Sequence, residues 1–194
     1  DLDGYQVVRG QLLSYIPERP CISVSGKRLG FNVDCIRKFQ NVRYVQLLLH
    51  PTERKIAIRP CGKNDVHSIP WRASFDRPIT GKSLSCQHFE SALYEIMEWN
   101  PDYSYRIRGT WISKGTSQII IFNLEEAQPF TYMQVKKNDS DELARRRINM
   151  IPEEWNDEFG LDFYNYGLQN EYYTLELNPE WNAEIKSRPV VGSE

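Results

Sequence analysis

Alternation of apolar and polar positions predicts most of the β-strands in the first 130 residues. Residues 21–25 alternate, and the turn residues Gly26-Lys27 come before a second predicted strand over residues 28–31. Two longer stretches, 44–60 and 103–124, each hold two strand-like runs on either side of a polar turn. Each of these stretches therefore predicts a β-hairpin.

A different spacing predicts two helices. Apolar residues at intervals of three and four form one stripe of a helix that Ser85 would cap and Pro101 would end. The residues of this stripe are Phe89, Ala92, Leu93, Ile96 and Met97. Asn32 is a suitable N-cap for a shorter helix that runs to Phe39.

These elements predict an α+β fold in which an antiparallel sheet carries its helices on one face. The two halves, 20–62 and 80–127, share the order of turn, helix, strand, turn and strand, which favours a duplicated βαββ unit. Few residues are identical between the halves, so the α+β prediction stands with or without a duplication. We therefore expect one α+β core domain over residues 1–130.

The character of the chain changes after Pro129. Residues 131–194 are acidic and rich in Trp and Tyr, and we expect an extension that packs on the core. An acidic aromatic surface offered to a partner is the alternative. Residues 139–147 place acids first and three arginines last, which is the charge order that a helix dipole favours. A helix over 152–159 and a strand over 172–177 are also predicted.

The formal net charge of −2 hides an uneven distribution. Residues 1–130 carry 17 basic and 13 acidic side chains, a net charge of +4, whereas residues 131–194 carry 7 and 13, a net charge of −6. The basic excess is sharpest in residues 27–82, where 12 basic and 4 acidic side chains give +8. Such a segment attracts phosphate groups. The alternative is a solvated surface that favours Lys and Arg for no functional reason.

No catalytic or metal-binding pattern is visible in the sequence. His50, His67 and His88 stand at spacings from the cysteines that fit no structural zinc site. A glycine-rich phosphate loop and a nucleophile elbow are also missing. We therefore expect a non-enzymatic protein that uses no metal and no other cofactor.

Cysteine usage and hydropathy bear on the compartment. The four cysteines are widely spaced and form no CxxC pair, which favours reduced thiols. The sequence contains no leader pattern and no run of the roughly 20 apolar residues that a membrane-spanning helix needs. We expect a cytoplasmic protein that does not bind a membrane.

Binding through basic side chains is the function that the residues favour most. Arg106 and Arg108 alternate with apolar residues in a predicted strand, so they point from one face and could hold a nucleic-acid backbone. The alternative is that every half-buried strand presents polar residues to solvent. The predicted nucleic-acid-binding residues are Lys27, Arg28, Arg37, Lys38, Arg43, Arg54, Lys55, Arg59, Lys63, Arg72, Arg77, Lys82, Arg106 and Arg108.

Several short motifs make the chain resemble a known group of proteins. They include Asn32-x-x-Cys35-x-x-Lys38-Phe39, Ile58-Arg59-Pro60-Cys61, Met97-x-Trp99-Asn100-Pro101-x-Tyr103 and Glu154-Trp155-x-x-x-Phe159-Gly160-Leu161. From about residue 3 to 165, the sequence resembles small proteins of integrative and conjugative elements in gut Firmicutes, which are often labelled integrases. The resemblance implies a bacterial mobile genetic element and a part in DNA transactions.

The residues do not support recombinase chemistry in this chain. His50 and Arg54 are one residue further apart than the His-x-x-Arg pair of tyrosine recombinases, and they span a predicted turn. We therefore predict a DNA-binding accessory or regulatory protein of a mobile element. The alternative is an anti-defence protein, anti-CRISPR-like in action, that binds a host nucleoprotein effector through its acidic C-terminal region.

Overall fold

The computed structural model describes residues 3–9, 12–13, 19–136 and 143–162. The chain divides into two compact units: a main unit of residues 17–152, and a terminal unit of residues 1–16 with 153–194. The boundaries between these units follow residues 16 and 152, whereas the expected boundary was at residue 130. None of the helices in the described ranges is both long enough and apolar enough to span a membrane.

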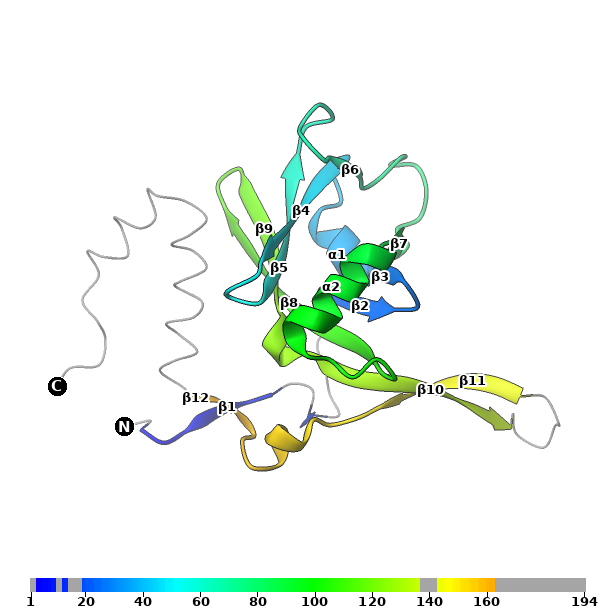
Figure 1. Ribbon diagram of the computed structural model, residues 1–194. Helices are drawn as coiled ribbons and strands as arrows, with labels where there is room; N and C mark the ends of the chain where they lie inside the picture. The colour runs from blue at the N-terminus through cyan, green and yellow to red at the C-terminus, as the bar shows by residue number, and fades with distance from the viewer. Residues whose placement is uncertain (1–2, 10–11, 14–18, 137–142, 163–194) are drawn as a thin grey trace. The chain divides into compact units, whose positions relative to one another are not determined.

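The described residues of the main unit form an antiparallel sheet of ten strands with two α-helices (Figure 1). The strands are β2 (Cys21–Ser25), β3 (Arg28–Phe31), β4 (Tyr44–His50), β5 (Lys55–Cys61), β6 (Ile69–Pro70), β7 (Lys82–Ser85), β8 (Ser104–Lys114), β9 (Ser117–Asn123), β10 (Gln128–Lys136) and β11 (Leu143–Asn149). The helices are α1 (Val33–Lys38) and α2 (Gln87–Met97), and the short 3-10 helix η2 (Leu124–Glu126) links β9 to β10.

Strand β8 joins the two parts of the sheet because its two halves pair with different neighbours. Its first half pairs with β2, where Ile107 lies opposite Ile22, and also with β10. Its second half pairs with β9, where Gly109 lies opposite Phe122. The strand order β6-β4-β5-β9-β8-β2-β3-β7 therefore passes through β8, and β10 with β11 branches from it. The sheet curls around this shared strand into a half-barrel.

Gly109 lies where the two halves of β8 meet. A Cβ atom at this position would lie 2.5 Å from Cε1 of Phe122 and 2.8 Å from Cγ2 of Ile120. The backbone N–H of Gly109 also donates a hydrogen bond to the carbonyl of Pro20 at 2.8 Å. The missing side chain therefore lets the Phe122 ring pack directly across the strand at the bend.

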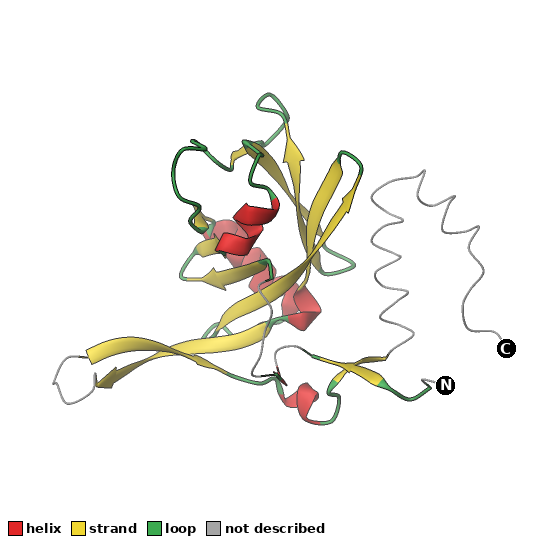
Figure 2. Cartoon of the chain, turned by 180° about the vertical axis from the view of Figure 1, so that it is seen from behind, coloured by secondary structure: helices red, strands yellow, loops and turns green. Residues whose placement is uncertain are grey.

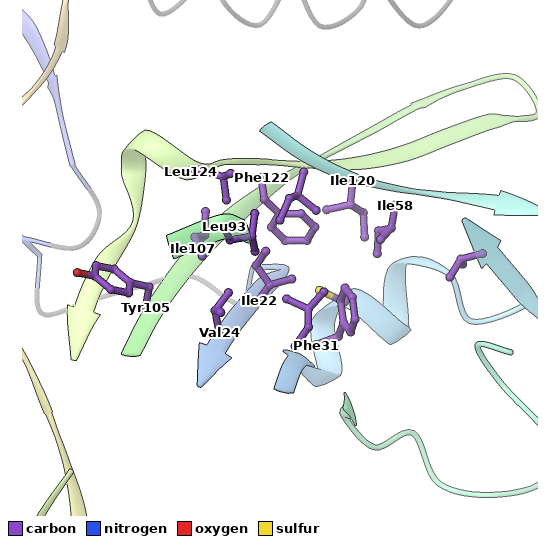
Figure 3. Close-up of a cluster of buried hydrophobic side chains, with 14 of the residues drawn as sticks. Ile22, Val24, Phe31, Ile58, Leu93, Tyr105, Ile107, Ile120, Phe122 and Leu124 are labelled. Carbon is purple, nitrogen blue, oxygen red and sulfur yellow. The ribbon is translucent and has the colours of Figure 1, made fainter. Parts of the chain in front are cut away.

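The inner face of the curled sheet encloses the hydrophobic core (Figure 3). Ile22 of β2, Ile107 of β8 and Ile120 of β9 are fully buried there. Helix α1 adds Ile36 and helix α2 adds Leu93 to the same cluster. Removal of these side chains from water is the main term that stabilises the fold.

The predicted architecture was wrong, although the local elements on which it relied were confirmed. Both predicted hairpins form, and the side chain of Asn32 caps α1 by accepting a hydrogen bond from the backbone N–H of Cys35 at 3.1 Å. The expected α+β layering, with duplicated βαββ units and helices on one face of the sheet, is not found. The sheet curls so far that it encloses the core itself, and two short helices complete that core.

Two of the predicted helices also differ from the structure. Ser85 ends β7, and α2 begins after Cys86, which makes no side-chain capping hydrogen bond. The helix predicted over 139–147 is wrong in its described part, because residues 143–149 form β11 and pair with β10. Pairing with a neighbouring strand outweighs the local charge order that favours a helix.

The terminal unit contains a two-stranded sheet of its own. Strand β1 (Gln6–Val8) pairs with β12 (Gly160–Asp162) in antiparallel register. The helix predicted over 152–159 is a shorter 3-10 helix, η3 (Glu153–Asn156). Its Trp155 is buried, and the guanidinium of Arg9 lies 4.8 Å from the centroid of the Trp155 ring. The predicted strand over 172–177 lies outside the described residues, as does most of the expected extension.

Replacement of Gly109 by alanine is expected to lower the free energy of unfolding by about 1–3 kcal/mol, because the added Cβ would collide with Phe122. Denaturant unfolding measures this change. The matched control is Gly62→Ala, where the nearest atom outside the adjoining residues lies 3.6 Å away on Asp65 and the expected change is within about 0.5 kcal/mol. Equal stability of the two variants would show that the bend of β8 tolerates a side chain.

Candidate nucleic-acid interface

The outward face of one part of the sheet carries a band of basic side chains. Arg106 of β8 lies opposite Ser23 of β2 and Gln128 of β10, and Arg108 lies opposite Cys21. Because side chains alternate along a strand, all of these point away from the core. We name the outward surface of β3, β2, the first half of β8 (residues 104–108), β10 and β11 the arginine face. Its basic residues are Arg28, Arg106, Arg108, Lys136, Arg145 and Arg147.

The described strands of the arginine face contribute basic side chains to it and no acidic ones. No Asp or Glu occupies an outward position on the described parts of these five strands. The ion pairs found within the described ranges involve Arg37, Arg54 and Lys55, which lie elsewhere in the fold. An excess of charge of one sign on one surface produces a local potential that attracts anions.

Cys21 is buried within the arginine face. The Nε–H of Arg106 donates a hydrogen bond to Sγ of Cys21 at 3.0 Å. Burial raises the pKa of the Cys21 thiol, and the charges of Arg106, Arg108 and Arg147 oppose that rise without cancelling it. The thiol is therefore neutral near physiological pH and does not neutralise the arginines around it.

Arg108 occupies an energetically unfavourable position on this face. Its Nη2 atom is buried and has no hydrogen-bond partner among the described residues. Loss of solvent lowers the pKa of Arg108, and the charges of Arg106 and Arg19 lower it further. A buried donor atom of a charged group that lacks an acceptor costs stability. An anionic ligand would supply the missing acceptor and would relieve the repulsion between the arginines.

Arginines of β11 cover two aromatic rings of β10. The guanidinium carbon of Arg145 lies 3.9 Å from the centroid of the Tyr132 ring, and that of Arg147 lies 5.5 Å from the Phe130 centroid. The two rings pack edge to face with their centroids 5.5 Å apart. Such cation–π contacts hold each guanidinium in a defined orientation, so less rotamer freedom is lost when it binds an anion.

The predicted binding residues are only partly gathered by the fold. Arg28, Arg106 and Arg108 lie on the arginine face. The others lie elsewhere: Lys27, Arg37, Lys38, Arg43, Arg54, Lys55, Arg59, Lys63, Arg72, Arg77 and Lys82.

Some of these residues have contacts that serve the fold. Arg72 donates hydrogen bonds to three backbone carbonyls in and near its loop, and Lys38 lies 4.6 Å from the centroid of the Trp111 ring. Arg59 of β5 donates to the side chain of Gln46 of β4, and β9 separates β5 from β8 in the sheet. Their basic charge in the sequence therefore does not by itself place them at one site.

Sequence reasoning missed the contribution of Arg145 and Arg147, because it assigned them to a helix. The signal that could have found them lies in the preceding segment. Residues 128–136 are rich in aromatic and β-branched side chains and predict a strand. A strand of this kind needs a partner, and the next segment along the chain is the nearest candidate.

No model of a known protein family, no curated protein and no solved structure matches this chain. Within the described ranges, no three or more His, Cys, Asp or Glu side chains gather into a group that could hold a metal ion. The inference of a nucleic-acid interface therefore depends on the geometry and charge of the arginine face.

Replacement of Arg108 by methionine is expected to raise the free energy of unfolding by about 1 kcal/mol, the size typical of relieving an unfavourable functional site. The buried Nη2 atom without an acceptor and the repulsion by Arg106 give the sign: removal of the charged group relieves both, so the folded state is stabilised. Denaturant unfolding measures the effect, and Arg59→Met on an exposed position serves as the control. A lower free energy of unfolding in Arg108→Met would show that Arg108 does not destabilise the fold.

Thiol alkylation followed by mass spectrometry tests whether the cysteine environments are as described. Burial raises the pKa of Cys35 to about 12 and also raises that of Cys21, so both should react slowly with iodoacetamide in the folded protein. Cys61 is partly exposed and should react faster. All sites should react equally in denaturant. Rapid labelling of Cys21 would show that the arginines stabilise its thiolate, which would reduce the positive charge of the face.

Proposed function

We propose that this protein is a non-enzymatic DNA-binding factor that holds the phosphate backbone on its arginine face. The observation that carries the proposal is the gathering of Arg106, Arg108 and Arg147 around the neutral thiol of Cys21, with no acidic residue on the described face. The sequence motifs that resemble proteins of conjugative elements support an accessory or regulatory role on a bacterial mobile element.

Phosphodiester groups match the chemistry of this face. Arginine guanidinium groups bind phosphate oxygens through paired, charge-assisted hydrogen bonds. Hydroxyl groups also contact phosphates in protein–DNA complexes, and Ser23, Ser25 and Ser104 lie on the same face. The Oγ atoms of Ser25 and Ser104 already lie 2.8 Å apart. The face therefore offers both charged and neutral donors to a line of phosphates.

A salt titration of binding to a labelled DNA duplex tests the proposal. Affinity should fall steeply as salt rises, and each phosphate contact that is removed should reduce the slope of log affinity against log salt by about 0.9. Arg28→Gln and Arg106→Gln should each show this reduction. Arg59→Gln, on β5 and outside the arginine face, should retain the full slope.

The proposal fails if the folded protein binds no DNA even at low salt, or if Arg59→Gln weakens binding as much as the face variants. Circular dichroism and denaturant unfolding establish that each variant is folded. In the absence of DNA binding, the acidic C-terminal region should be tested against host nucleoprotein effectors.

A further inference from the structure

Strands β10 and β11 continue beyond the sheet as a two-stranded ribbon. β10 pairs with β8 only from Gln128 to Phe130, whereas its pairing with β11 runs on to Lys136 opposite Leu143. Figure 2 shows this ribbon projecting away from the rest of the sheet. We name residues 131–136 and 143–148 the arm. Beyond Phe130, the described residues of the arm pair with no other strand.

The described residues of the arm carry basic side chains on both faces, and each face has exposed residues. Arg145 and Arg147 continue the arginine face, while Arg146, opposite Met133, points to the other side. Met133 is 52% exposed, and Leu143 is 60% exposed. A ribbon that lay flat on an anionic surface would need positive charge on one face only. Positive charge on both faces suits a ribbon that enters a space with anionic walls on both sides.

We propose that the arm inserts into the major groove of double-stranded DNA. This inference rests on the proposed function, and it specifies the form of DNA that is bound and the groove that the arm enters. Neighbouring strands lie about 4.8 Å apart. The major groove of B-form DNA is about 12 Å wide and admits a two-stranded ribbon, whereas the minor groove is about 6 Å wide. Phosphates line both edges of the groove, where arginines on both faces of the arm can reach them.

Features of the arm favour a duplex over a single strand. Proteins that bind single strands offer open aromatic faces on which bases stack. Here Arg145 lies 3.9 Å from the Tyr132 ring centroid, and Phe130 is only 1% exposed. The Tyr132 side chain remains 40% exposed, but Arg145 covers one face of its ring and Phe130 is buried, so the two rings form no continuous stacking surface. The deep, narrow major groove of A-form RNA excludes such an arm, so DNA is the favoured duplex.

Groove-blocked duplexes test the inference directly. The probes are a short mixed-sequence duplex, the same duplex with glucosylated hydroxymethylcytosine filling its major groove, and the unmodified duplex saturated with netropsin in its minor groove. Glucosylation should weaken binding about tenfold, on the order of one lost base contact, and netropsin should change it by less than about twofold. Fluorescence anisotropy measures all three affinities.

The variant Arg145→Gln/Arg146→Gln separates the arm from the rest of the face. It should bind unmodified DNA more weakly and should lose the difference between plain and glucosylated duplexes. Arg59→Gln, the matched control, should keep that difference. Each substitution replaces an exposed strand residue by one of similar length, so folding should be retained.

Each remaining outcome identifies what is wrong. If the protein binds plain and glucosylated duplexes equally, the arm does not enter the major groove, although the proposed function stands. Inhibition by netropsin would overturn the inference and would place the arm in the minor groove. Stronger binding to single-stranded DNA than to the duplex would also overturn it and would indicate base stacking. If no form of DNA binds, the proposed function itself fails.

Discussion

The pairing of β8 with β2, β9 and β10 is the constraint on which the rest of the structure depends. It fixes which side chains of β8 face inward, and Ile107 is fully buried as a result. The same register places Arg106 and Arg108 on the outside. Because the side-chain repeat of a strand is two, a slip by one residue would bury both arginines and expose the core residues. The hydrophobic core therefore enforces the arginine face.

The arginine face opposes folding, and the core offsets its cost. Arg108 has a buried donor atom without a partner among the described residues, and neighbouring arginines repel it. Burial of apolar side chains on the other side of the same strands supplies the favourable term. Sites that bind ligands are commonly less stable than the surrounding fold would allow. A local conflict of this kind, on strands that are otherwise regular, is therefore evidence for a ligand.

The sequence contained the local information but not the long-range pairing. Alternation over residues 103–124 predicted the hairpin and placed Arg106 and Arg108 on one face, as the register confirms. The curl could not be predicted, because it depends on β8 pairing with β2, which lies far away in the chain. Residues 143–149 were predicted as part of a helix because their charge order was read without the partner strand β10.

The short helix η2 explains why the aromatic residues of β10 lie on the same side of the sheet as the arginines. Phe122 lies opposite Gly109, and Gln128 lies opposite Arg106. The two β8 residues are three positions apart in the sequence, whereas Phe122 and Gln128 are six positions apart. The three residues of η2 supply the difference. An insertion of odd length reverses which residues point inward. Phe122 therefore packs in the core, while Phe130 lies on the opposite side of the sheet, where it is buried and Arg147 lies over its ring. Leu124 anchors η2 in the core, so this change of face is fixed by burial.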